Sequence, residues 1–98
     1  MRIENGNAIV VVMQNPREKV FGILEELSPA GVFIRGIDLG YFDEWIKAIN
    51  SGEPILPMQD TFYPMWRVER LSLDVGSESF PSMSELFEQK TGRTLGDF

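Results

Sequence analysis

The chain has 98 residues, of which 43% are hydrophobic, and this size suits one domain with a single core. It contains neither cysteine nor histidine, which excludes disulfides, thiolate nucleophiles, histidine-based triads and zinc sites of the Cys/His kind. Fifteen acidic residues against nine basic ones give a net charge of −6, which disfavours binding to phosphate backbones. We therefore expect one domain over residues 1–98 that is not an enzyme and holds no metal or cofactor.

The hydropathy of the chain also bears on its location. No stretch approaches the roughly 18 consecutive apolar residues of a membrane span. The polar start, residues 1–7, lacks the apolar core of a secretory signal. These two observations predict a cytoplasmic protein that does not enter a membrane.

Residues 8–13 (AIVVVM) are the first strong structural segment, a β-branched run too short for a helix and apolar at every position. This run predicts a buried strand, and Asn15 with Pro16 predicts a turn after it. Apolar side chains fall on both faces of residues 19–27, which predicts a second strand. Gly22 within that strand indicates a sharp bend or a bulge.

A Ser-Pro-Ala-Gly turn at residues 28–31 precedes a third predicted strand over residues 32–37. Beyond it, apolar residues recur at the i, i+3, i+4, i+7 spacing of a helix near residues 41–51. The stripe consists of Phe42, Trp45, Ile46 and Ile49. Asparagine and glycine in residues 50–52 end this helix, because both tolerate the left-handed conformation.

The second half of the chain is less regular. Three prolines in residues 53–64 exclude a long central strand and predict an extended connection along the surface. Residues 65–74 predict a strand whose apolar positions change parity, which a β-bulge near Glu69 and Arg70 explains.

A second short helix is predicted over residues 82–91. Ser82 followed by Glu85 makes a capping-box pattern, and Gly92 marks the end of the helix. The tail at residues 93–98 is expected to fray. The element order β, β, β, α, β, α predicts an α+β, mainly β fold: a small, strongly bent antiparallel β-barrel with two short helices.

Residues 19–37 (KVFGILEELSPAGVFIRGI) resemble the strand, glycine, bent strand, turn and strand run of Sm-like small β-barrels. The resemblance implies a barrel in which a glycine lets a curved strand wrap around a small core. Sm-like RNA binders carry an aspartate and an asparagine in the turn where this chain has residues 28–31. The uridine-binding signature is therefore missing, and so is the second Sm signature, an arginine and a glycine before the last strand.

Aromatic residues form the most conspicuous candidate site. The candidate partner-binding residues are Tyr41, Trp45, Met58, Phe62, Tyr63 and Trp66. Aromatic residues also dominate cores by buried area, so a core role is the alternative. Prolines, methionines and tryptophan in the same segment are the composition of binding hot spots, which favours an interface.

Charged residues offer no catalytic pair. Adjacent carboxylates, such as Glu25 with Glu26, point to opposite faces of a strand, so they do not form an acid/base dyad. Arg67, Glu69 and Arg70 predict a solvated outer face with cross-strand ion pairs.

The leading hypothesis for function is therefore a non-catalytic protein-interaction or self-assembly domain. We expect a homo-oligomer, because residues 8–13 and 19–27 are apolar on both faces while a barrel interior receives only one. A protein partner fits the same aromatic segment. An Sm-like nucleic-acid-binding protein is the alternative, although the acidic composition makes nucleic acid an unfavoured partner.

Overall fold

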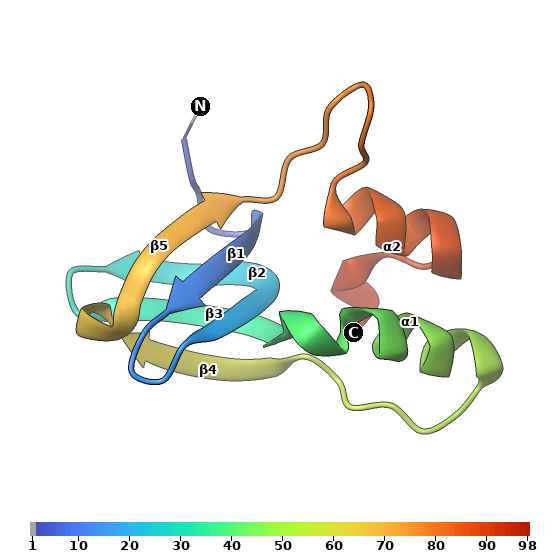
Figure 1. Ribbon diagram of the computed structural model, residues 1–98, viewed down its shortest axis with the longest axis horizontal. Helices are drawn as coiled ribbons and strands as arrows, with labels where there is room; N and C mark the ends of the chain where they lie inside the picture. The colour runs from blue at the N-terminus through green and yellow to red at the C-terminus, as the bar shows by residue number, and fades with distance from the viewer. Residues whose placement is uncertain (1) are drawn as a thin grey trace.

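The computed structural model describes residues 2–98. Over these residues the fold is α+β, with five strands, two α-helices and three short 3₁₀ helices (Figure 1). In chain order they are β1 (Ala8–Met13), β2 (Glu18–Ser28), β3 (Gly31–Asp38), η1 (Leu39–Tyr41), α1 (Phe42–Ser51), β4 (Gln59–Pro64), η2 (Met65–Arg67), β5 (Val68–Leu73), α2 (Met83–Thr91) and η3 (Leu95–Asp97). No helix in the described part of the chain is long and apolar enough to cross a membrane.

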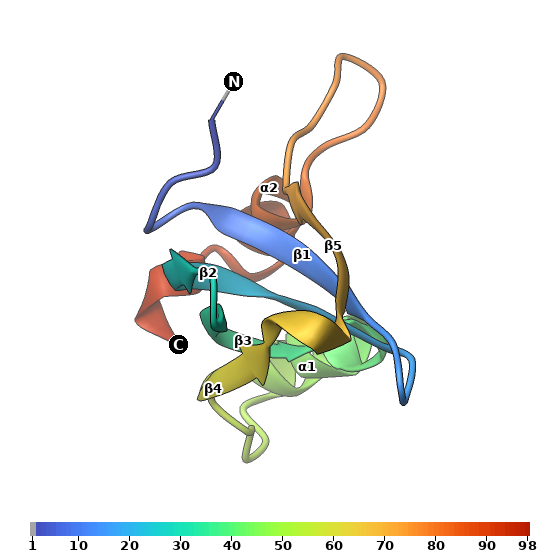
Figure 2. The ribbon, with the colours of Figure 1, turned by 90° about the vertical axis from the view of Figure 1, so that its left-hand side faces the viewer.

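The strands form one antiparallel sheet in the order β4-β3-β2-β1-β5. Figure 2 shows this sheet curling on itself, with η2 carrying the chain from β4 to β5. In residues 2–98 no strand pairing joins β4 to β5, so the sheet is open. The expected closed barrel is therefore not formed, because β4 and β5 are both sheet edges that are linked only through η2.

The sheet has an apolar cluster on each of its two faces. The cluster on the concave face contains Ile9, Val11, Met13, Val20, Leu24, Val32 and Ile34. The cluster on the other face joins Phe21 and Ile37 of the sheet to Phe42, Trp45, Ile46, Met58, Phe87 and Leu95. Figure 1 shows α1 and α2 lying together on the same side of the sheet. The helices and the C-terminal segment thus cover the outward face of the sheet around Phe21 and Ile37.

This covering changes the argument for self-association. Val10 of β1 and Ile23 of β2 point away from the concave face and pack against the helical cluster. The second apolar face of these two strands is therefore covered within one chain. A partner copy is not needed to bury it, so any self-association has to use another surface.

Two bulges bend the sheet. Val12 pairs with Arg70 while Met13 pairs with Val68, so Glu69 is the extra residue, which confirms the bulge predicted from the parity change. In β2 the extra residue is Glu25, between Leu24 and Glu26, and not Gly22.

Gly22 has a different role from the one expected. It pairs in regular register with Gly36 of β3. A Cβ atom at Gly22 would overlap the Arg35 carbonyl oxygen and lie 2.5 Å from the Gly36 Cα. The glycine therefore permits a close approach of two backbones and does not mark a bulge.

Three further differences concern the second half of the chain. Residues 59–64 form the edge strand β4, where an extended connection was expected; Pro64 is compatible with an edge. Strand β5 begins at Val68, because the three residues before it form η2. The C-terminal segment does not fray: Leu95 is buried, and Phe98 packs edge-on against Trp45 and Phe87.

The two helices form where the sequence predicts them. Helix α1 ends at Gly52, which has a positive φ of 72°. Helix α2 begins with the predicted capping box: the Ser82 hydroxyl accepts a hydrogen bond from the Glu85 N–H, and the Glu85 carboxylate accepts one from the Ser82 N–H.

Candidate interaction surface

Two of the six candidate interface residues lie in the core. Trp45 is 0% exposed; its indole N–H donates to the Leu56 carbonyl at 3.0 Å, and its ring stacks on Phe87 with centroids 5.0 Å apart. Met58 is buried in the same cluster. Neither side chain can contact a partner in this structure, so their predicted place in an interface is wrong and the core alternative holds for both.

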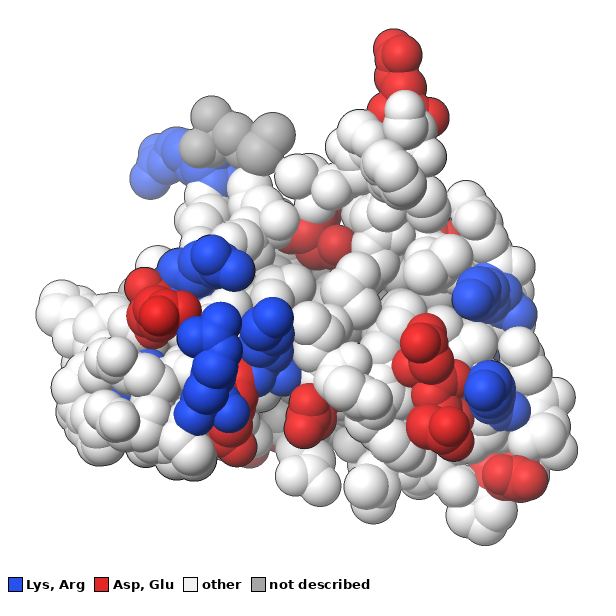
Figure 3. All heavy atoms as spheres, viewed as in Figure 1, with Lys and Arg blue, Asp and Glu red and all other residues white. Residues whose placement is uncertain are grey.

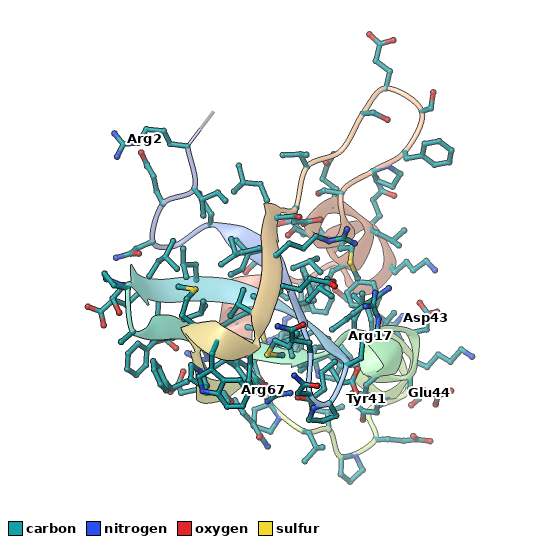
Figure 4. The ribbon with its side chains drawn as sticks, turned by 60° about the vertical axis from the view of Figure 1, so that its left-hand side comes forward. Arg2, Arg17, Tyr41, Asp43, Glu44 and Arg67 are labelled. Atoms are coloured by element: carbon teal, nitrogen blue, oxygen red, sulfur yellow. The ribbon has the colours of Figure 1, made fainter. Side chains whose placement is uncertain are left out.

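Tyr41 and Tyr63 are half-buried and line a cleft with a cavity volume of about 230 Å³. The cleft opens between β4 and the first residues of β2, with Val20 and Ile34 among the lining residues. Figure 4 shows Tyr41 at the start of α1, near Asp43 and Glu44. Burial and the nearby Glu18 carboxylate raise the pKa of the Tyr63 hydroxyl, which therefore stays protonated at neutral pH.

The other two candidates, Phe62 and Trp66, are exposed, at 41% and 66%. They belong to a group of exposed apolar side chains where β2, β3, β4 and η2 meet, at the end of the sheet that faces the viewer in Figure 2. We call this group the aromatic end: it consists of Leu27, Phe33, Phe62, Met65 and Trp66.

The aromatic end is held together by contacts across the strands. Phe33 of β3 pairs directly with Phe62 of β4, and their ring centroids are 4.7 Å apart. The Phe62 ring also lies over Gly31, where a Cβ atom would come within 2.8 Å of the ring. The Met65 N–H donates to the Ala30 carbonyl at 2.9 Å, which ties η2 to the turn between β2 and β3. The exposed side chains thus rest on a fixed backbone.

Strand β4 leaves one backbone edge free. In residues 2–98 its backbone groups make hydrogen bonds to β3 and none to any other strand. In an antiparallel ladder, every second residue is hydrogen-bonded to the partner strand. Because Met65 bonds to Ala30, the residues of β4 that bond to β3 are Gln59, Thr61 and Tyr63. The N–H and C=O groups of Asp60 and Phe62 therefore point away from β3, toward the free edge.

The opposite edge, β5, is protected against pairing. It carries the bulge at Glu69 and the charged side chains of Glu69 and Arg70, devices that natural sheets use to block strand addition. The centre of β4 holds Thr61, Phe62 and Tyr63 and carries no charge. Strand β4 thus combines free backbone groups with the exposed apolar side chain of Phe62, whereas the exposed side chains of β5 include Glu69 and Arg70.

Basic side chains gather near the turn between β1 and β2 and on β5, as Figure 3 shows, but acids lie among them. Arg17 pairs with Glu69 at 3.6 Å, and Arg67 pairs with Glu18 at 2.6 Å. Arg67 also donates to the Gln14 and Pro16 carbonyls, so its charge is used to hold the turn. The pairing of Arg17 and Arg67 with carboxylates reduces the positive charge that this area offers to a polyanion.

Carboxylates lie on the outer side of β4 as well. Asp60 pairs with Arg35 of β3 in the strand register. The neighbouring Asp60 carboxylate, which hydrogen-bonds the protonated form, raises the pKa of the exposed Glu25. Two acids close together near the free edge disfavour any partner that would place a third acid beside them.

No protein-family model, curated protein or solved structure matches this chain. The surface must therefore be interpreted from its own chemistry.

Sequence reasoning missed Phe33 and Leu27. Phe33 lies inside a run that predicts a strand, where an apolar residue is expected to be buried. A signal was present: Phe33 shares a strand face with Arg35, while Val32 and Ile34 occupy the other face. The face that carries an arginine is the face that meets solvent.

Proposed function

We propose that this protein is a non-catalytic protein-interaction domain that binds its partner at the aromatic end, by adding a strand to the free edge of β4. The observation that supports this most directly is the combination in β4 of unpaired, outward-pointing backbone groups at Asp60 and Phe62 with the exposed pair Phe33 and Phe62. Strand addition uses both: the backbone supplies affinity and the alternate side chains supply specificity.

Nucleic-acid binding, the alternative that the Sm-like resemblance implies, has less support. Arg17 and Arg67 are paired with carboxylates, and the net charge of the chain is −6. Binding to a nucleic acid draws much of its affinity from lysine and arginine that are free to neutralise phosphates.

A photocrosslinking experiment tests the proposal. Phe62 is replaced by benzoylphenylalanine in the full chain in its native cells, and Phe80, which is 74% exposed on the loop before α2, is replaced in the same way as the matched control. We expect a discrete adduct from position 62, absent from position 80 and lost when Phe33→Asp is added. Equal adducts at both positions, or none at position 62, would contradict a docking role for β4.

A further inference from the structure

We propose that the partner is a second copy of this chain, joined through the two β4 edges in antiparallel pairing about a two-fold axis at Phe62. The inference rests on the proposed function and names its partner. It does not depend on the outward faces of β1 and β2, which the helices already cover.

Backbone geometry limits the pairing to few registers. The free edge of β4 offers the N–H groups of Asp60 and Phe62, while Pro64 offers only its carbonyl. Within the strand, two registers use both donors on each copy: one with the two-fold axis at Thr61 and one with the axis at Phe62. Each forms four hydrogen bonds between the copies.

Side-chain chemistry separates these two registers. With the axis at Thr61, each Asp60 faces the partner's Phe62 and lies diagonal to the partner's Asp60, which brings two carboxylates close together. With the axis at Phe62, each Asp60 faces the partner's Pro64, and no acid opposes another. The second register therefore avoids the repulsion that the first one creates.

The register at Phe62 also extends a contact that the single chain already has. Phe33 and Phe62 stack across β3 and β4, and the axis would place Phe62 beside the partner's Phe62, with Cα atoms about 5.5 Å apart. Four phenyl rings would then form one row across the joined sheet. Aromatic pairs between neighbouring strands are among the cross-strand pairs that stabilise a sheet.

The flanking residues are complementary in the same register. Gln59 would lie opposite the partner's Met65, so the exposed Trp66 of one copy approaches the exposed Leu56 that precedes β4 in the other. Trp66 and Leu56, the two most exposed apolar side chains near β4, would become covered together. Repetition by the two-fold axis closes the assembly at two copies.

Light scattering on the full chain over a range of concentrations tests the inference. The wild-type mass should rise from 11.2 kDa toward twice that value. Phe62→Lys and Phe62→Glu should each remain at 11.2 kDa at concentrations where the wild type is dimeric, because like charges would meet at the axis. An equimolar mixture of the two variants should recover the dimer, because lysine would then face glutamate.

The control is Phe80→Lys, which should dimerise like the wild type. Circular dichroism checks that the Phe62 variants fold, as expected for a side chain that is 41% exposed. If Phe62→Lys dimerises by itself, lysine is facing Asp60 and the axis lies at Thr61, which overturns the proposed register. A mixture that stays monomeric overturns it too.

The wild-type mass separates this inference from the proposed function. If the wild-type chain remains at 11.2 kDa at every concentration, the partner is not a second copy of this chain. An adduct from position 62 with another protein would then still support the proposed function. A dimer that every Phe62 variant retains, with no adduct from position 62, overturns both.

Discussion

Among the glycines of the sheet, Gly22 is the one at which an added Cβ atom would come closest to another atom. Gly22→Ala would force its Cβ onto the Arg35 carbonyl oxygen, and that oxygen is fixed by the pairing of β2 with β3. We expect the free energy of unfolding to fall by about 3 kcal/mol, the upper end of the usual cost of overpacking, because the atom that is met is backbone; urea denaturation measures this. Gly96→Ala is the matched control, since a Cβ there meets no atom within 4 Å. Equal effects of the two substitutions would refute the close approach.

Arg67 joins two segments that are distant in sequence. Its guanidinium binds the Glu18 carboxylate at 2.6 Å and the Pro16 and Gln14 carbonyls at 2.9 and 3.2 Å, and its side chain is only 15% exposed. Arg67→Ala should therefore lower the free energy of unfolding by about 2 kcal/mol.

The conservative substitution refines this prediction. Arg67→Lys keeps the charge but cannot reproduce the fork of donors, so it should recover less than half of the loss. Thermal unfolding of both variants at the same salt concentration provides the comparison. Full recovery by lysine would show that the charge alone matters.

At the scale of elements, the start of α2 is held by the side chains of Ser82, Glu85 and Asp74. Ser82 caps the helix through Glu85, and the Asp74 carboxylate accepts hydrogen bonds from the Met83 and Ser84 N–H groups at 2.8 and 2.9 Å. Ser82→Ala should lower the free energy of unfolding by about 1 kcal/mol, the usual value of an N-cap. Ser79→Ala, on the exposed loop before the helix, should leave it unchanged in the same denaturant titration. Matching losses in both variants would argue against the cap.

The elements with local signals could be predicted from the sequence. The first three strands follow from apolar runs between turns, α1 from its stripe, α2 from its capping box, and the bulge at Glu69 from the change of parity. Strand β4 has no such signal. Pro57 precedes the strand and Pro64 is its last residue. Its regular structure comes from pairing with β3, a segment distant in sequence.

Whole-molecule arrangement decides which aromatic residues are available to a partner. Trp45 and Trp66 are the same residue type in the same segment, yet one is buried by α2 and the C-terminal Phe98 while the other stands on η2. Composition identifies an aromatic segment but does not tell which of its residues are exposed. Burial depends on the packing of α1 against α2, which one sequence does not reveal. The Sm-like resemblance stays a prediction.

The contrast between the two tryptophans makes the protein its own fluorescence reporter. In Trp66→Phe the remaining indole, Trp45, is enclosed by aromatic rings, so its emission should be blue-shifted and resist quenching by acrylamide until the chain unfolds. In Trp45→Phe the remaining Trp66 should emit like an indole in water and be quenched readily. Its emission should shift toward the blue when the aromatic end is covered. Two single-tryptophan chains can thus report unfolding and docking separately, in solution and without a label.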